Sequence, residues 1–163
     1  MEELEHAMRR SSAQGALFGQ SVANRVGLSS SDMECLDFVI LEGRVTAGRL
    51  AEVTGLTTGA ITGVVDRLEE AGLVRRERDD HDRRKVFIAA IPENTAKIGK
   101  FYEHLQRAML KVWDSYSDAE LRLLLRFATQ GYETMLAATE ELKTMMEDPK
   151  SKRAGARKPG RAP

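Results

Sequence analysis

The chain has 163 residues, 42% of them hydrophobic and 31% charged, with 25 basic side chains balancing 25 acidic ones. This length suits one domain with a core of useful size, and the hydrophobic share at zero net charge is too high for a disordered chain. No apolar run in the sequence is long enough to span a membrane, and the single cysteine, Cys35, excludes an internal disulfide. We therefore expect a globular protein of the cytoplasm.

The neutral total hides an uneven distribution of charge. Residues 149–163 contain six cations, no acid and three of the four prolines, which leaves 19 basic against 25 acidic residues in 1–148. We expect one domain over 1–148 followed by a disordered basic tail, because this segment has no large apolar residue to bury. Such a tail could add phosphate contacts or could simply be a solvated end.

The first 43 residues predict two helices. A loose helical spacing of apolar residues runs from Leu4 to Val26. A capping box of Ser31 and Glu34 predicts the start of a second helix, and Gly43 its end. The apolar face predicted for this second helix comprises Met33, Leu36, Val39 and Ile40.

The segment from Ala47 to Leu68 has the pattern of a helix-turn-helix. Thr46 is a candidate cap for a short helix that carries Leu50 and Ala51, and Thr57 for a second helix that Gly72 stops. The small Ala51 suits the point where two helices cross, and Gly55, four positions later, suits a tight turn. The apolar contacts that would fix the crossing angle come from Leu50, Leu56, Ile61 and Val64.

A change of pattern after Gly72 predicts a β-hairpin followed by further helices. Residues 73–78 and 86–91 are strand-like, and the charged connection 79–85 separates them. Pro92 suits the first turn of a helix that we expect to continue through 95–116. Ser117 and Glu120 form a capping box for a last long helix, expected over 118–146.

A helix held by such a turn can lie in the major groove of DNA with its amino end near phosphates and base edges. Hydroxyls of Thr57, Thr58 and Thr62 would lie on the exposed face there and could donate to phosphate oxygens. Further along the same helix, Arg67 could reach the DNA backbone.

The hairpin connection adds three consecutive cations, Arg83, Arg84 and Lys85, and guanidinium groups suit a narrow minor groove. Asp82 stands two residues before Arg84 and could orient its side chain. Taken alone, these charges also describe a solvated turn with local ion pairs. Directly after a helix-turn-helix they favour DNA contact.

Leu56–Val74, followed by Arg75–Arg84, resembles the MarR family of bacterial winged-helix transcription regulators. The resemblance in helix order runs from about residue 4 to 146, and the specific motif covers about 47 to 92. It implies a mostly α (α+β) fold with a winged helix-turn-helix over about 30–92, a two-stranded wing, and dimerisation helices over 1–28 and 93–148.

The resemblance also implies a function. It implies a homodimer on a pseudo-palindromic operator, with the helix after Thr57 in the major groove and the wing arginine in the minor groove. The Asp-x-Arg motif of the family's wing matches Asp82 and Arg84, and its helix Asp-Arg pair matches Asp66 and Arg67. We thus expect a repressor that a small anionic aromatic effector releases.

Two departures from the family pattern stand out. Gly63 occupies an exposed helix position where many members carry a larger, often basic, residue, so it should contribute little direct base contact. Residues 91–95 lack the Leu-Thr pair typical of that junction. Phe18, Met33, Phe38 and Tyr102 could line an effector cleft, but ordinary core packing explains each of them equally well.

Other functional classes find less support in the sequence. A redox regulator acting through Cys35 is an alternative, although no His, Lys or Arg neighbours the thiol to lower its pKa. The three histidines are too far apart for a metal site, and no catalytic constellation is present, so we expect neither a cofactor nor an enzyme. A winged-helix module that binds protein instead of DNA also remains open.

Overall fold

The computed structural model describes residues 1–79, 82 and 84–147. Arg83 and the basic segment 149–163 therefore lie outside the described residues. The chain divides into two compact units, Met1–Lys111 and Val112–Pro163, which are described separately below. The expected single domain over 1–148 stays a prediction.

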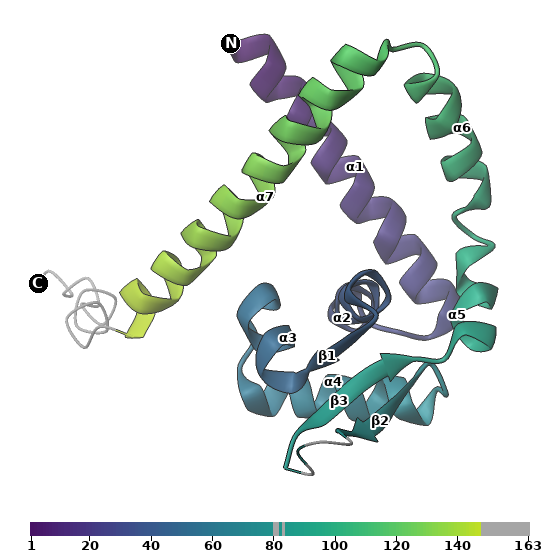
Figure 1. The fold of residues 1–163 in the computed structure, drawn as a ribbon, viewed down its shortest axis with the longest axis vertical. Coiled ribbons are helices and arrows are strands. Elements are labelled where there is room, and N and C mark those ends of the chain that lie inside the picture. Colours follow the sequence, from purple (N-terminus) through teal and green to yellow (C-terminus); the bar gives the residue numbers. More distant parts are fainter. Residues whose placement is uncertain (80–81, 83, 148–163) are drawn as a thin grey trace, which may run out of the picture. The chain divides into compact units, whose positions relative to one another are not determined.

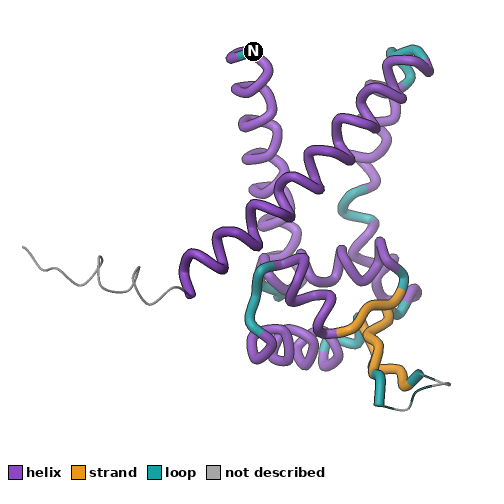
Figure 2. Tube along the Cα trace, turned by 60° about the vertical axis from the view of Figure 1, so that its left-hand side comes forward, coloured by secondary structure: helices purple, strands orange, loops and turns teal. Residues whose placement is uncertain are grey.

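The first unit carries the winged helix-turn-helix (Figure 1). Its strands are β1 (Arg44–Thr46), β2 (Val74–Arg78) and β3 (Val86–Ala90), and the hairpin of β2 and β3 projects from the helices of this unit (Figure 2). Its helices are α1 (Glu2–Val26), α2 (Ser30–Glu42), α3 (Ala47–Thr54), α4 (Thr58–Glu70) and α5 (Pro92–Gly99), together with most of α6 (Glu103–Trp113).

The start of α2 differs from the prediction. The capping box consists of Ser29 and Asp32, since the Ser29 side chain accepts from the Asp32 N–H at 3.2 Å and the Ser29 N–H donates to the Asp32 carboxylate at 3.0 Å. The box predicted from Ser31 and Glu34 is therefore wrong by two residues. The predicted buried face is also wrong at Ile40, which is 47% exposed.

The predicted helix-turn-helix is confirmed. Thr46 accepts from the Arg49 N–H at 3.2 Å and so caps α3, while Gly55 turns the chain with a φ of 75°. A β-carbon at this φ would be strained, which explains the glycine. The shared core of α2, α3 and α4 includes the fully buried Leu36, Leu50, Ile61 and Leu68.

The predicted hairpin is confirmed, but it belongs to a sheet of three strands instead of two. The order is β1-β3-β2, and all pairings are antiparallel. Val45 of β1 lies opposite Ile88, which in turn lies opposite Arg76 of β2. No sequence pattern indicated β1, because the strand has three residues and only Val45 is buried.

The helix predicted over 95–116 is broken. Pro92 does begin α5, as expected, but α5 ends at Gly99 and α6 starts at Glu103. In between, the N–H groups of Phe101 and Tyr102 bond to carbonyls three residues back, at 3.0 and 2.9 Å. These tighter turns interrupt the α-helical hydrogen bonding at Gly99, a residue type that weakens a helix.

The second unit contains α7 (Asp118–Glu147), whose predicted capping box is confirmed. The Ser117 hydroxyl and the Ser117 N–H both donate to the Glu120 carboxylate, at 2.6 and 2.8 Å, and these two bonds lower the pKa of Glu120. A lone helix cannot cover its own apolar face, and α7 leaves Leu123, Leu124, Leu125, Phe127, Tyr132, Met135, Leu142 and Met145 exposed. In the described part of the chain, no helix is apolar and long enough to cross a membrane.

Candidate nucleic-acid interface

The amino end of α4 is open to solvent. Thr57 caps the helix by accepting from the Ala60 N–H at 3.3 Å, and both Thr57 and Thr58 are exposed. The helix start leaves the N–H groups of Thr58 and Gly59 without an acceptor inside the helix. These donors and the positive end of the helix dipole favour an anion such as a phosphate.

Thr62, the third predicted contact, lies one turn further along and is also exposed. Its hydroxyl donates to the carbonyl of Thr58 at 3.1 Å, so the hydroxyl hydrogen is already engaged in a bond within the helix. The hydroxyl oxygen can still accept, and the methyl group can still make apolar contacts. Donation from Thr62 to a phosphate, as predicted, would require this internal bond to break.

Arg67 is anchored to α2. Its Nη2 lies 2.6 Å from Oδ1 of Asp32 and its Nε 3.2 Å from Oδ2, so the pair is bidentate. The Asp32 side chain is 3% exposed and that of Arg67 is 53% exposed. Burial opposes ionisation of Asp32, but hydrogen bonds from Arg67 and Ser29 outweigh it and lower the pKa of the carboxyl. Arg67 therefore holds α4 against the start of α2.

Gly63 lies beside this arginine, at a distance that would also accommodate a β-carbon. A β-carbon at Gly63 would lie 3.5 Å from Nη1 of Arg67, so the guanidinium runs over the face that the glycine leaves bare. The sequence marked Gly63 as a departure but missed Asp32 as a partner of Arg67, 35 residues away. The only local signal for Asp32 was its place three residues after Ser29, which is the spacing of a capping box.

The family-like Asp66 and Arg67 do not pair with each other but with separate partners. Asp66 bonds to Nη2 of Arg76 on β2 at 2.5 Å, and Glu69 bonds to Nη1 of the same arginine. These bonds raise the pKa of Arg76 above its usual value, with the Asp66 hydrogen bond as the largest cause. The network ties α4 to the base of the wing.

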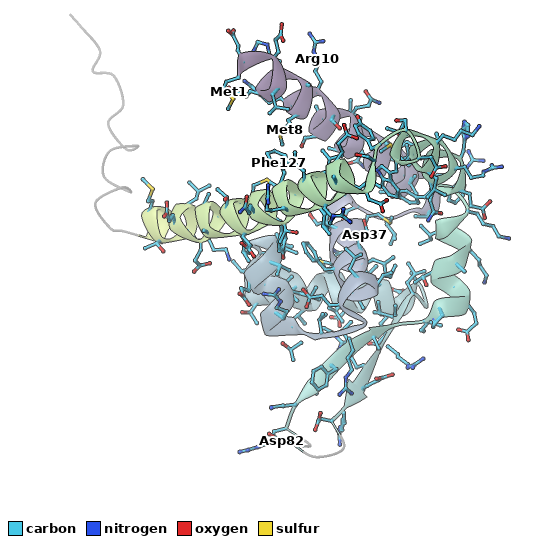
Figure 3. The ribbon with its side chains drawn as sticks, turned by 45° about the horizontal axis from the view of Figure 1, so that its top comes forward. Met1, Met8, Arg10, Asp37, Asp82 and Phe127 are labelled. Carbon is cyan, nitrogen blue, oxygen red and sulfur yellow. The ribbon has the colours of Figure 1, made fainter. Side chains whose placement is uncertain are left out.

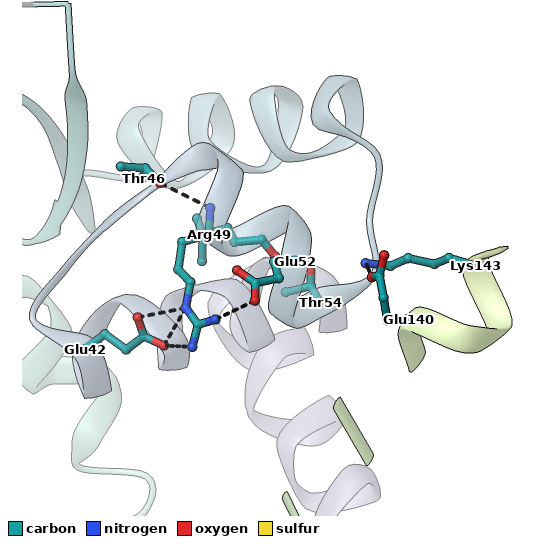
Figure 4. A network of polar contacts seen from close by, with 8 residues as sticks. Glu42, Thr46, Arg49, Glu52, Thr54, Glu140 and Lys143 are labelled. Carbon is teal, nitrogen blue, oxygen red and sulfur yellow. Dashed lines mark hydrogen bonds and ion pairs between the residues drawn. The ribbon is translucent and has the colours of Figure 1, made fainter. Parts of the chain in front are cut away.

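The basic residue of α3 is also paired (Figure 4). Arg49 lies between two acids, with Nη2 3.1 Å from Oε1 of Glu42 and Nη1 3.1 Å from Oε1 of Glu52. Residues 47–70, all of which the structure describes, thus hold both of their basic side chains in ion pairs. Any cation of this unit that contacts a nucleic acid outside these ion pairs must therefore lie outside residues 47–70, and the wing offers Arg84 and Lys85.

At the wing, Asp82 organises the turn as predicted. The N–H and the Nε of Arg84 both donate to Oδ1 of Asp82, each at 3.1 Å, and the Asp82 N–H donates to Asp79 at 2.8 Å. The Arg84 side chain is nevertheless 92% exposed, and Lys85 is exposed beside it. Asp82 lies at the far end of the hairpin (Figure 3), so the arginine is both held and presented outward.

Comparison with known proteins identifies this arrangement. A sequence model described as MarR family matches residues 26–85. The chain is 35% identical over 135 residues to the uncharacterized HTH-type transcriptional regulator YcgE of Bacillus subtilis, covering 83% of this chain and 88% of that protein. The chain belongs to the MarR family. It is thus a member of a family of DNA-binding transcriptional regulators.

Other relatives agree with this assignment. The HTH-type transcriptional repressor YetL of Bacillus subtilis is 27% identical over 111 residues, which is 67% of this chain and 66% of that protein. The structure of a MarR family protein from Bacillus stearothermophilus superposes with a TM-score of 0.61 at 28% identity, over 82% of this chain and 94% of that one. The transcriptional regulator Tm0710 from Thermotoga maritima, at 21% identity over 86% and 99% of the two chains, shares the fold with a TM-score of 0.60.

This MarR-family chain has a pocket of about 600 Å³ within its first unit. It is lined by Ala13, Gly15, Ala16, Leu17, Gly19, Gln20, Ser30, Met33, Glu34, Asp37 and Tyr102. Of the four side chains that the sequence suggested for a cleft, Met33 and Tyr102 line it. Phe18 meets the Tyr102 ring edge-on with centroids 5.3 Å apart, and Phe38 packs against the core.

The ionisable side chains that line this pocket include two acids, Glu34 and Asp37. Burial, with a further contribution from Glu34, raises the pKa of Asp37. Burial and then Asp37 raise the pKa of Tyr102. No basic residue is among these lining residues, each of which the structure describes.

Cys35 is fully buried in the core, and burial raises the pKa of its thiol to about 11. Asp32 and Glu34 add to this rise. A thiol in this environment is mostly protonated at neutral pH and is shielded from solvent, which is the opposite of a reactive cysteine. The described residues contain no cluster of His, Cys, Asp and Glu that could hold a metal ion.

Proposed function

We propose that the protein is a homodimeric, sequence-specific DNA-binding repressor of transcription that a small-molecule effector releases. The observation that carries the proposal is the combination, in one compact unit, of an open amino end on α4 and an arginine at the wing tip that is 92% exposed yet held by Asp82. The relative YetL, which is named as a repressor, supports the direction of regulation.

The residues have different roles in this proposal. Thr57 and Thr58 bind phosphates at the amino end of α4, and Thr62 contacts the groove beside them. Arg84, with Lys85 and Arg83, enters the minor groove, where the potential is most negative, and Asp82 limits the freedom of Arg84. We assign Arg67 to support of α4, because Asp32 holds its guanidinium.

Selection of bound fragments from genomic DNA of the source organism tests the proposal. A two-fold dimer should select pseudo-palindromes whose half-sites are about 34 Å, or a multiple of this, apart. If the purified protein selects no fragment above background, the DNA-binding proposal is wrong. The alternative of a winged helix that binds protein would then be the better account.

The apolar side chains that α6 and α7 leave exposed support the proposed homodimer. On α6 these are Leu105, Met109, Leu110, Val112 and Trp113, in addition to the α7 side chains named above. Apolar faces of this extent are unusual on monomers and mark protein contacts. Light scattering after size exclusion should give twice the 18.1 kDa of one chain. A mass of one chain at micromolar concentration would contradict the dimer.

The effector is proposed to occupy the pocket beside Met33 and Tyr102. The family resemblance led us to expect an anionic aromatic ligand, but Glu34 and Asp37 favour a cation next to the ring of Tyr102. Aromatic amines and aromatic carboxylates of matched size, titrated into the protein–DNA complex, distinguish the two. We expect the amines to lower DNA occupancy and an Asp37→Asn variant to respond less. Release by carboxylates alone would support the earlier expectation.

A further inference from the structure

The exposed face of α4 offers few groups that can recognise a base through hydrogen bonds. Side chains that do so in the major groove are mainly Arg or Lys for guanine, Asn or Gln for adenine, and Asp or Glu for cytosine. Throughout α4, which the structure describes in full, there is no Lys, Asn or Gln, and the one arginine is bound to Asp32. Asp66 and Glu69 are bound to Arg76. Glu70 is the last residue of the helix, far from its amino end.

The groups that remain at the amino half are small and partly apolar. At 3.6 residues per turn, Gly59 and Gly63 lie opposite the buried Ile61, with Ala60 and Thr62 on either side of them. Since the Thr62 hydroxyl donates to the Thr58 carbonyl, its methyl group is available for contact. This face therefore combines bare backbone with methyl groups.

Gly59 is not explained by the fold of the chain itself. A β-carbon at this position would meet no atom within 4 Å, and its φ is not positive. Glycine also weakens a helix relative to alanine. A glycine that no internal contact requires, on the face directed at the proposed ligand, suits a close approach of another molecule to the helix backbone.

We infer that α4 recognises thymine methyl groups, and that the operator carries A·T pairs beneath the amino half of this helix. The inference rests on the proposed function and specifies its operator. The 5-methyl of thymine is the apolar group that a base pair presents in the major groove, and Ala and Thr methyls are suited to contact it. Gly59 and Gly63 let the backbone come close enough for the short side chains of Ala60 and Thr62 to reach it. Arg84 also suits A·T-rich DNA, whose minor groove is narrow.

Replacing thymine by uracil in the selected operator tests this inference, because it removes the methyl and leaves every base-pairing group unchanged. Each contacted thymine should weaken binding about fourfold, which corresponds to about 0.8 kcal/mol for one buried methyl group. Uracil at flanking positions should have no effect. Specific binding that is insensitive to uracil at every half-site position, or half-sites that require guanine or cytosine there, would overturn the inference and leave the proposed function standing. Binding that is indifferent to sequence would overturn both.

Two variants of Thr62 link the effect to a residue. Thr62→Ser removes the methyl and keeps the hydroxyl, whereas Thr62→Val keeps a methyl and removes the hydroxyl. We expect Thr62→Ser to bind the thymine operator about fourfold more weakly and to lose its response to uracil at one position. Thr62→Val should keep that response. The reverse result would show that the hydroxyl carries recognition at this position and would overturn the role assigned to the methyl group.

Discussion

Asp32 provides a test of how α4 is held in place. Asp32→Asn keeps an oxygen that can accept from the Ser29 N–H, so the capping box is largely preserved, but it removes the charge that binds Arg67. In the native protein the Asp32 carboxylate accepts from Nη2 and Nε of Arg67 at distances of 2.6–3.2 Å, and its side chain is 3% exposed. The variant therefore isolates the ion pair from the cap.

The expected magnitude follows from this geometry. Breaking a buried ion pair typically lowers stability by 3–5 kcal/mol, but Arg67 is half exposed and can be rehydrated, so we expect a loss of about 2–3 kcal/mol. Urea denaturation at a fixed protein concentration should show a lower midpoint with an unchanged slope. Ser29→Ala is the matched control, since it removes the cap hydroxyl and keeps the pair; it should lose about 1 kcal/mol.

The pH dependence of the difference gives a further check. Because the pKa of Asp32 is lowered in the folded protein, its stabilising effect is complete above the unfolded value of 3.8 and is lost as the pH falls further. The difference in free energy of unfolding between the native protein and Asp32→Asn should therefore decrease below about pH 4. In a protein that already carries Arg67→Met, adding Asp32→Asn should lower the free energy of unfolding much less than it does in the native protein. Equal losses in both backgrounds would refute the role assigned to the pair.

Further predictions concern single positions. Gly59→Ala should raise the free energy of unfolding by about 0.5–1 kcal/mol and yet weaken operator binding; calorimetry and DNA titration check the two signs, and a loss of stability would contradict the reasoning. Cys35 should react with a thiol reagent far more slowly in the folded protein than in urea, because burial raises its pKa to about 11; equal rates would restore the redox alternative. Asp37→Asn should maintain or raise stability at pH 7, since the raised pKa of Asp37 makes its ionised form unfavourable in the folded state, and the difference should fade below about pH 4. A clear loss of stability at pH 7 would contradict this.

Much of the helix-turn-helix could be predicted from the sequence because its signals are local. Thr46 and Thr57 cap helices through their own first turns, and Gly55 supplies the positive φ of the turn between them. The wing motif was equally local, since Asp82 binds a side chain only two residues away. Each of these features depends on a few neighbouring residues, and the local pattern was sufficient.

What the sequence missed depends on contacts between distant segments or on competing local patterns. The partner of Arg67 lies 35 residues before it, and no spacing rule connects the two. At the start of α2, Ser29 and Ser31 offered two overlapping boxes, and burial of Asp32 against Arg67 favours the first. β1 exists because Val45 pairs with Ile88, and a three-residue strand has no periodicity of its own. The break after Gly99 was missed because the apolar spacing continues across it.

The account depends most on DNA contact by the wing, and the salt dependence of operator binding tests it directly. Affinity measured at several salt concentrations should fall steeply for the native protein. For Arg84→Ala it should be lower throughout, and the slope should be shallower by about 0.9 for each of the two arginines of a dimer. An affinity and a slope equal to those of the native protein would contradict the claim that this exposed arginine, held by Asp82, contacts DNA.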